Sequence, residues 1–301
     1  MRAYGFHKIG GPENEAFLDV PVPVPGTGEL LVRVRAAGVN PGDWKLRDGS
    51  YGVEGPAVLG REVAGTVEQV GAGVEGFAVG DEVFGGTPNM TGGWAELALV
   101  TGSFAALRPD GVAPADAASL PVAAGTAYDA LTGLGLEPGA TLLVNGAGGG
   151  VGISAVQLAV ARGLTVVGTA SPGKHELLRS YGAVPVAYGD GVVERVRAVA
   201  PGGVDAVFDL VGGAALRAVA ELVADRSKLV TVADRPLAAE LGGGGVERDR
   251  SRAVLTELAR LVAAGELDPH VTDVRPLDDA AAALALVESG HATGKVALQL
   301  R

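Results

Sequence analysis

Short alternations of apolar and polar residues run through the first third of the chain. Glu29–Ala37, Glu62–Val70 and Glu82–Phe84 are rich in valine, and glycine and proline separate them. Alternation of this kind, punctuated by turn formers, predicts short β-strands. We therefore expect a β-rich unit over residues 1–118.

The pattern changes near residue 120, where apolar segments begin to alternate with amphipathic segments of helical length. The first pair is Thr141–Asn145 followed by Val151–Arg162. The series continues with Thr165–Thr169 before Lys174–Tyr181, Val184–Ala187 before Val192–Val199, Val204–Leu210 before Ala214–Ala224, and finally Lys228–Val232. This alternation predicts an α/β unit over residues 119–250, with a parallel sheet covered by helices on both faces.

After Val232 the alternation ends in a polar, glycine-rich connector, Leu241–Asp249. Helical spacing of apolar residues predicts a helix over Ser251–Ala264. Two strand-like segments, His270–Val274 and Lys295–Leu300, then flank a further helical segment, Leu277–Ser289. If the last strand rejoins the first unit, residues 251–301 return to it and the α/β unit is an insertion.

Composition narrows the class of protein. The 301 residues include no cysteine, and 35 acidic side chains against 24 Lys and Arg give a net charge of −11, which argues against nucleic acid as a partner. The first residues lack the apolar core of a secretory signal. Pro138–Ala161 is uncharged and long enough to span a membrane, but it contains Asn145 and a cluster of glycines. We expect a cytoplasmic protein without a membrane segment.

Five of the seven residues in Gly146–Gly152 are glycine, and the run lies between a predicted strand and a predicted helix. In a dinucleotide-binding turn, one glycine permits the tight turn, another lets the pyrophosphate approach, and a third allows helix and strand to pack closely. The alternative is a glycine-rich entry to a helix. The position at the head of the α/β series favours nucleotide binding, through Gly146, Gly149, Gly150, Val151 and Gly152.

The end of the second strand of this series indicates which dinucleotide is bound. An Asp or Glu there is typical of NAD binding, but the sequence has no acid between Thr169 and Lys174. The hydroxyl of Ser171 and the cation of Lys174 suit a 2′-phosphate. We therefore expect NADPH as the cofactor. The alternative is that Ser171 caps a helix and Lys174 is merely exposed.

Several further motifs, in this order, resemble the medium-chain dehydrogenase/reductase superfamily in its zinc-independent, quinone oxidoreductase-like branch, which includes zeta-crystallin. The matching segments are 37–43 (AGVNPGD), 59–65 (LGREVAG), 79–85 (VGDEVFG), 92–96 (GGWAE), 121–128 (PVAAGTAY), the glycine turn, 204–213 (VDAVFDLVGG) and 290–296 (GHATGKV). The resemblance implies a GroES-like β-barrel catalytic domain with an inserted Rossmann domain.

The same motifs indicate whether the chain can bind a catalytic zinc ion. Zinc-dependent members of the superfamily have a Cys in the first motif and Gly-His-Glu in the second, where this chain has Asn40 and Gly60-Arg61-Glu62. The four histidines show no ligand-like spacing. We expect no metal, and without a Lewis acid the acceptor must already be electrophilic, such as a quinone or a carbonyl-conjugated C=C.

The resemblance implies the remaining site residues. Asn40 and Tyr51 line the catalytic site, where Tyr51 could protonate the product, and Thr126 lies beside the nicotinamide. Around the rest of the cofactor it implies Tyr188 with Lys174 at the 2′-phosphate, Val211 and Ala233 near the nicotinamide ribose, and Lys295 closing over the cofactor. Three alternatives stay open: Asn40 as a turn residue before Pro41, Tyr51 as a cover for the barrel, and Lys295 at the surface.

Members of the superfamily commonly form a homodimer through a sixth strand of the Rossmann sheet. The corresponding segment here, Leu241–Asp249, is short, glycine-rich and charged, which argues against a long strand and against dimerisation by that route. Two other functions remain open. The first is an enoyl reductase acting on a thioester or biosynthetic intermediate, and the second is an NADPH-binding sensor without turnover.

Overall fold

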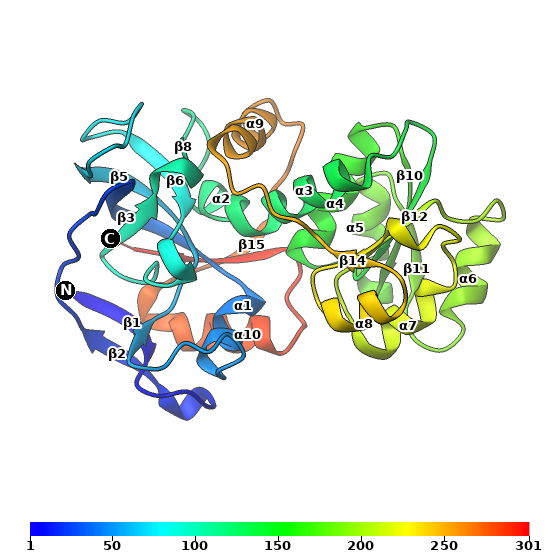
Figure 1. Cartoon of the computed structure of the whole chain (residues 1–301), viewed down its shortest axis with the longest axis horizontal. Helices are drawn as coiled ribbons and strands as arrows, with labels where there is room; N and C mark the ends of the chain where they lie inside the picture. Colours follow the sequence, from blue (N-terminus) through cyan, green and yellow to red (C-terminus); the bar gives the residue numbers. More distant parts are fainter. Residues whose placement is uncertain (301) are drawn as a thin grey trace. The chain divides into compact units, whose positions relative to one another are not determined.

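The computed structural model describes residues 1–300. The chain forms two compact units. The first unit comprises Met1–Val122, Arg250–Gly265 and the residues from Pro269 onward, and the second comprises Ala123–Asp249 and Glu266–Asp268. In Figure 1 the second unit is coloured from green to yellow.

A seven-stranded sheet forms the frame of the first unit, in the order β15-β16-β3-β5-β6-β8, with β7 also paired to β3. Its strands are β3 (Glu29–Val39), β5 (Glu62–Val70), β6 (Glu82–Gly86), β7 (Leu97–Thr101), β8 (Ala105–Leu107), β15 (Val271–Pro276) and β16 (Lys295–Gln299). A three-stranded sheet adds β2 (Glu15–Asp19), β1 (Arg2–Phe6) and β4 (Ala57–Val58). β16 pairs antiparallel with β3, and Val296 lies opposite Val39. The end of the chain therefore returns to the first sheet, as the sequence pattern indicates.

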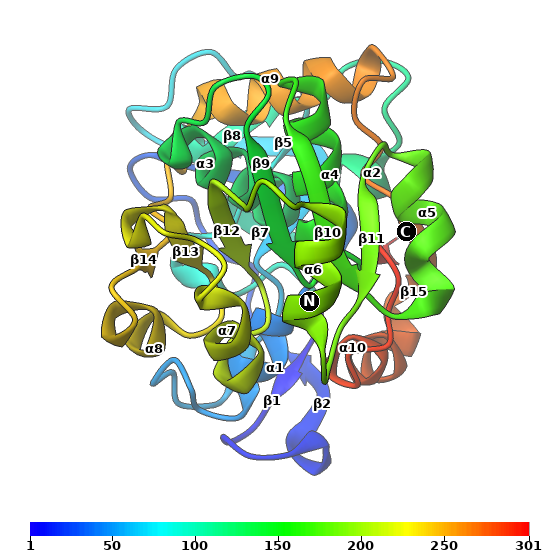
Figure 2. The same cartoon turned by 90° about the vertical axis from the view of Figure 1, so that its right-hand side faces the viewer.

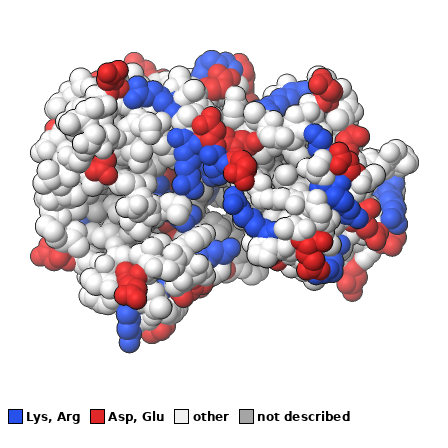
Figure 3. Space-filling model, in the orientation of Figure 1, with Lys and Arg blue, Asp and Glu red and all other residues white. Residues whose placement is uncertain are grey.

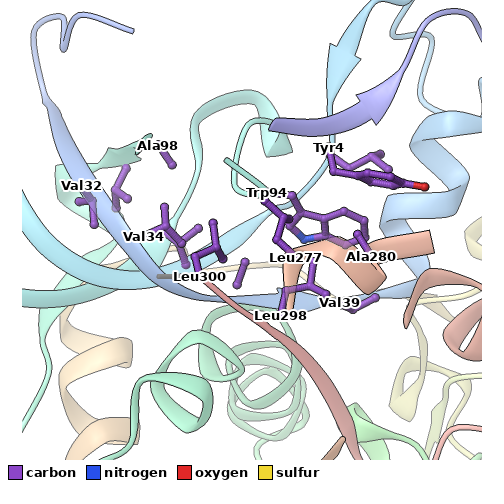
Figure 4. Close-up of a cluster of buried hydrophobic side chains, with 14 of the residues drawn as sticks. Tyr4, Val32, Val34, Val39, Trp94, Ala98, Leu277, Ala280, Leu298 and Leu300 are labelled. Carbon is purple, nitrogen blue, oxygen red and sulfur yellow. The ribbon is translucent and has the colours of Figure 1, made fainter. Parts of the chain in front are cut away.

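The core of the first unit surrounds Trp94, which is fully buried. Figure 4 shows its indole beside Leu277 and next to the ring of Tyr4, and the centres of the two rings are 6.2 Å apart. The indole Nε1 donates to the carbonyl of Gly38 at 3.2 Å, so the ring's one polar atom is satisfied. Four helices complete this unit: α1 (Pro41–Arg47), α2 (Pro114–Ala118), α9 (Arg252–Ala263) and α10 (Ala280–Glu288).

The second unit is a six-stranded parallel sheet in the order β11-β10-β9-β12-β13-β14. The strands are β9 (Thr141–Asn145), β10 (Thr165–Ala170), β11 (Val184–Ala187), β12 (Ala206–Asp209), β13 (Leu229–Thr231) and β14 (Gly244–Gly245). The helices are α3 (Gly125–Leu134), α4 (Gly150–Ala161), α5 (His175–Ser180), α6 (Val192–Val199), α7 (Gly213–Ala220) and α8 (Arg235–Glu240). Numbered along the chain, the strand order is 3-2-1-4-5-6, which is the order of the doubly wound dinucleotide-binding fold.

Both faces of this sheet are covered, as the continuous apolar strands predict. Successive residues of a strand point to opposite faces, and Leu142, Leu143 and Val144 in the central strand β9 are all fully buried. Leu143 belongs to a core cluster with side chains from α6, α7 and α8, while α4 packs on β9 and β10. Figure 2 shows these helices around the sheet.

The sixth strand is present but minimal. β14 contains only Gly244 and Gly245, and Gly244 pairs with Val230 of β13. Gly243 lies so close to β13 that an added Cβ would meet the carbonyl oxygen of Leu229 at 2.4 Å. The segment therefore adds a two-residue edge rather than a long strand, in agreement with the sequence.

The uncharged stretch Pro138–Ala161 folds as β9, the glycine turn and α4, rather than as one long helix. Among residues 1–300, no helix has both the length and the apolar character needed to cross a membrane.

Candidate active site

The glycine turn between β9 and α4 meets three different requirements at three positions. Gly146 has a φ of 92°, which favours glycine. Gly152 lies so close to the turn that an added Cβ would meet the carbonyl oxygen of Gly146 at 2.5 Å. At Gly149 no heavy atom lies within 4 Å of an added Cβ. These features correspond to the tight turn, the close packing of helix and strand, and the open approach that a pyrophosphate needs.

The first turn of α4 presents its amides toward this open approach. Gly149 is the N-cap, and its carbonyl accepts from the amide of Ile153 at 2.8 Å. The amides of Gly150, Val151 and Gly152 come before the first intrahelical hydrogen bond, so they have no acceptor within the helix. They also carry the positive end of the dipole of a 12-residue helix. This geometry suits an anionic diphosphate.

Three polar side chains follow β10 and β11 at the same edge of the sheet. Ala170 pairs with Ala187, so Ser171 and Tyr188 leave the sheet from neighbouring strands. The Lys174 ammonium donates to the carbonyl of Gly148 at 3.1 Å, and burial lowers its pKa. Lys174 is therefore not merely an exposed lysine, because its ammonium contacts the glycine turn.

Ser171 begins a short 3₁₀ turn, but its side chain makes no capping hydrogen bond there. Tyr188 is 64% exposed. A hydroxyl, a phenol and a cation thus follow the ends of two neighbouring strands, β10 and β11, on the side of the sheet where this fold binds the far end of a dinucleotide.

On the other side of the glycine turn, Val211 and Ala233 each lie two residues beyond the end of a strand, β12 and β13. Val211 is 53% exposed, and its Cγ2 would lie 2.9 Å from a Cβ added at Gly146. The structure thus places Val211 against the turn. From β9 the chain adds β10 and β11 on one side and then β12 and β13 on the other, so the strand order reverses between β9 and β12. Such a topological switch point is where these folds bind ligands.

Thr126 is buried in α3 and accepts a hydrogen bond from Arg248 Nη1 at 2.5 Å. Arg248 Nε also donates to Asp129 Oδ2 at 2.8 Å. Burial raises the pKa of Asp129, although the hydrogen bond from Arg248 opposes that shift. The sequence analysis did not single out Arg248, because the arginine lies in the polar connector and its partners are 119 and 122 residues away.

The sequence analysis gave no role in the site to four further polar residues. One lies near the carboxyl end of each of four neighbouring strands: Thr169, Asn145, Asp209 and Thr231. All four are buried. A polar residue that ends an otherwise apolar strand was the signal in the sequence that could have revealed them.

In the first unit, Asn40 and Lys295 meet at a buried carboxylate. Glu62 Oε1 accepts from Lys295 Nζ and from Asn40 Nδ2, both at 2.8 Å. Lys295 Nζ also donates to Asn40 Oδ1 at 2.6 Å and to the carbonyl of Val39 at 3.3 Å. Lys295 is only 4% exposed, so the surface alternative for this residue is wrong. Contact of Lys295 with a cofactor stays a prediction.

Next to this cluster, Asp43 is buried in α1. Its Oδ2 accepts from the backbone amide of Asn40 at 2.7 Å, which makes Asp43 a helix-capping carboxylate. Burial raises the pKa of Asp43 to about 6, although the charge of Arg61 opposes the shift.

The guanidinium of Arg61 lies 4.8 Å from the centre of the Tyr51 ring, and Tyr51 is 44% exposed. The arginine also lies against α1, because a Cβ added at Gly42 would meet its Nη1 at 2.1 Å. The structure thus brings Tyr51 to Arg61, and Asn40 to Lys295 and Glu62.

The position that corresponds to the zinc site of the zinc-dependent members carries no ligand set. Asn40 and Arg61 occupy it, and neither an arginine nor an amide held by Lys295 and Glu62 is a zinc ligand of the usual kind. Across residues 1–300, no group of three His, Cys, Asp or Glu side chains could hold a metal ion.

Two known families match parts of this chain. Residues 26–112 match the family described as alcohol dehydrogenase GroES-like domain, and residues 181–298 match the family described as zinc-binding dehydrogenase. The chain has 28% identity to the quinone oxidoreductase from Coxiella burnetii, with a TM-score of 0.92 over 100% of this chain and 99% of the other. It has 26% identity to the Escherichia coli quinone oxidoreductase complexed with NADPH, with a TM-score of 0.90 and full coverage of both chains.

Curated relatives include two different kinds of protein. The erythronolide synthase of Saccharopolyspora erythraea is 37% identical over 90% of this chain, and the synaptic vesicle membrane protein VAT-1 homolog of Homo sapiens is 32% identical over 92%. The chain spans 80% of the human protein but 8% of the synthase, and 43% and 51% of two further VAT-1 proteins.

The chain is therefore a medium-chain dehydrogenase/reductase of the quinone oxidoreductase-like branch. The expected fold class, a GroES-like domain with a Rossmann-type parallel sheet, is confirmed.

Proposed function

We propose that this protein is an NADPH-dependent reductase that transfers hydride to a quinone or an α,β-unsaturated carbonyl compound without a metal ion. The observation that carries the proposal is the glycine turn. It combines an open approach at Gly149, unbonded helix amides and the Lys174 ammonium at one edge of the parallel sheet. A diphosphate with an additional phosphate at one end suits this arrangement of donors.

The choice of NADPH over NADH rests on the end of β10. After Ala170 the chain continues Ser171-Pro172-Gly173-Lys174, without the carboxylate that would accept from a ribose 2′-hydroxyl. The Lys174 ammonium already lies at the glycine turn, where it donates to the carbonyl of Gly148, and a dianionic phosphate is a stronger acceptor than a carbonyl. The solved E. coli relative contains NADPH, which supports the same choice.

Bound NADPH would supply the hydride. Side chains of the first unit would stabilise the negative charge that then develops on the acceptor oxygen. Such charge requires a preorganised donor. Tyr51 is a half-exposed residue that offers a hydroxyl, and its ring lies 4.8 Å from the Arg61 guanidinium. Asn40 Nδ2 carries a second proton beyond the one given to Glu62. We assign Tyr51 and Asn40 to this role, with Lys295 and Glu62 holding Asn40 in place.

Charge on the surface agrees with a small-molecule acceptor. The face drawn in Figure 3 carries Lys and Arg interspersed with Asp and Glu, and the net charge is −11. Binding of nucleic acid would instead require a basic surface that neutralises several phosphates.

One observation favours a second candidate function, reduction of an enoyl thioester. The chain matches a small part, 8%, of the erythronolide synthase over 90% of its own length, so the same fold occurs as a module of a biosynthetic enzyme. The hydride chemistry is the same for both candidates, and only the shape and charge of the acceptor differ.

A panel of quinones, cyclic enones and enoyl thioesters, assayed with NADPH and with NADH, tests the proposal. We expect NADPH oxidation to be fastest with a quinone or an enone. A kcat/KM highest with an enoyl thioester would favour the second candidate. Cofactor binding without oxidation by any acceptor would indicate a sensor. Tyr51→Phe and Asn40→Ala should both lower turnover, and unchanged rates for both would remove them from the mechanism.

A further inference from the structure

A row of buried polar side chains crosses four neighbouring strands of the second unit. Thr169 of β10 pairs with Asn145 of β9, Asn145 pairs with Asp209 of β12, and Asp209 pairs with Thr231 of β13. Because the four residues occupy the same register, their side chains form a continuous chain of hydrogen bonds across the sheet. Asp209 and Thr231 are fully buried, and the other two are at most 2% exposed.

Asp209 accepts hydrogen bonds from both sides of the row. Asn145 Nδ2 donates to Oδ1 at 2.8 Å, and Thr231 Oγ1 donates to Oδ2 at 2.6 Å. The backbone amides of Val211 and Gly212 donate to the same carboxylate at 3.0 to 3.3 Å. Asp209 is the acceptor in every one of these bonds, so each neighbour directs a proton toward it.

That arrangement fixes the direction of each remaining bond. Asn145 gives its amide nitrogen to Asp209, so its Oδ1 faces Thr169 and accepts from Thr169 Oγ1 at 2.8 Å. The Thr169 oxygen is then left to accept from the amide of Gly146, also at 2.8 Å. On the other side, Thr231 Oγ1 gives its proton to Asp209 and accepts from the amides of Ala233 and Asp234 at 3.0 and 3.3 Å.

The backbone amides that donate these bonds belong to three turns, all of which lie near the cofactor if it binds as the resemblance to the superfamily implies. Gly146 opens the glycine turn, Val211 follows β12, and Ala233 follows β13. The row holds all three turns without using any side chain that would itself touch the dinucleotide. Asp209 bonds directly to the turn after β12, and it is linked to the other two turns through separate side chains, Asn145 on one side and Thr231 on the other.

We infer that Asp209 is a positioning residue for the dinucleotide, which sets the glycine turn and the turns after β12 and β13 in one geometry through Asn145, Thr169 and Thr231. The inference rests on the proposed NADPH site. The inference predicts separate effects on the two halves of the cofactor. Thr231 supports only the turn near the nicotinamide ribose, whereas Thr169 supports the glycine turn.

The test compares Thr231→Val with Thr231→Ser, which retains the hydroxyl. Equilibrium titrations would use NADPH and adenosine 2′,5′-bisphosphate, a fragment that lacks the nicotinamide. We expect Thr231→Val to weaken NADPH binding by about tenfold, the loss of one well-made hydrogen-bonded group, and to leave fragment binding within about twofold. Thr231→Ser should bind both ligands as the wild type does.

Asp209→Asn supplies a second variant of nearly the same shape. Wherever its amide nitrogen points, that nitrogen faces another donor, because both carboxylate oxygens accept from nitrogen atoms. We expect weaker binding of both ligands. Hydrogen exchange in the cofactor-free protein gives an independent readout: Thr231→Val should accelerate exchange at Ala233 and Asp234 while Gly146 stays protected.

Three results would contradict the inference or its basis. If both Thr231→Val and Asp209→Asn bind NADPH within twofold of the wild type, Asp209 has no positioning role. If Thr231→Val weakens NADPH and the fragment equally, and in proportion to a lower Tm, the row only stabilises the sheet. If the wild type binds neither NADPH nor NADH, the proposed function itself fails, together with the positioning role.

Discussion

Replacing Gly149 by alanine should prevent tight NADPH binding while leaving the fold intact. An added Cβ meets no heavy atom within 4 Å, and the φ of −96° is one that alanine adopts. Alanine is a poorer N-cap than glycine by several tenths of a kcal/mol. It also lowers the conformational entropy of the unfolded chain, which stabilises the folded state by roughly 0.4 to 1 kcal/mol. The free energy of unfolding should therefore change by less than about 0.5 kcal/mol.

The same methyl group would occupy the approach that the pyrophosphate requires. We expect the Kd for NADPH to rise at least about tenfold, equivalent to about 1.4 kcal/mol. Isothermal titration gives the affinity, and urea unfolding gives the stability. Undiminished NADPH affinity in a folded Gly149→Ala variant would refute the placement of the phosphates on this turn.

Gly152→Ala is the matched control, because its Cβ meets protein instead of open space. The nearest atoms are Gly146 O at 2.5 Å and backbone atoms of Ala147 at 2.6 Å, so α4 must move away from the turn. Overpacking of this kind costs about 1 to 3 kcal/mol, which exceeds the helix-propensity gain of up to about 1 kcal/mol. This variant should lose stability as well as affinity.

Three further predictions concern charged groups. In steady-state kinetics, Lys174→Ala should raise the KM for NADPH by about tenfold to a hundredfold and leave the KM for NADH unchanged. An equal change for both cofactors would contradict the assignment of Lys174 to the 2′-phosphate. The pKa of Asp43 is raised to about 6 from 3.8, so between these pH values the folded state retains a proton that the unfolded chain has lost. The free energy of unfolding should therefore fall by about 3 kcal/mol as the pH rises from about 4 to about 6. Asp43→Asn should abolish that part of the pH dependence in urea unfolding, and an unchanged profile would refute the shift. Arg47→Met should destabilise the protein by about 3 to 5 kcal/mol, because it leaves Glu15 buried without its ion-pair partner, and adding Glu15→Gln should recover part of the loss in thermal unfolding.

The strands of the parallel sheet were the most predictable elements of the fold. Thr141–Asn145 and Val184–Ala187 have the predicted bounds because their apolar runs are short and end in polar or glycine-containing turns. Helix α8 gave no such signal, since only Ala238 of its six residues is buried and no apolar stripe exists. Apolar runs bounded by turns therefore identified the sheet, while a short helix with a single buried residue did not appear in the pattern.

The part of the candidate site that lies in one continuous segment could be predicted from the sequence. The glycine turn is contiguous, so its three roles follow from spacing. The burial of Lys295 depends on Glu62, which is 233 residues away, and no local pattern distinguishes that lysine from a surface one. The row through Asp209 depends on strand register, which places Asn145 and Thr231 beside it only after the sheet has formed.

Consumption of NADPH by the chelator-treated protein, followed by the absorbance of the reduced nicotinamide with a small quinone as acceptor, tests the central claim most directly. The account predicts that the wild type oxidises NADPH at the same rate before and after treatment with a chelator, and that Gly149→Ala shows only a small fraction of that rate at the same NADPH concentration. Loss of activity on chelation would contradict metal-free hydride transfer. Equal rates for the wild type and Gly149→Ala would contradict the cofactor site.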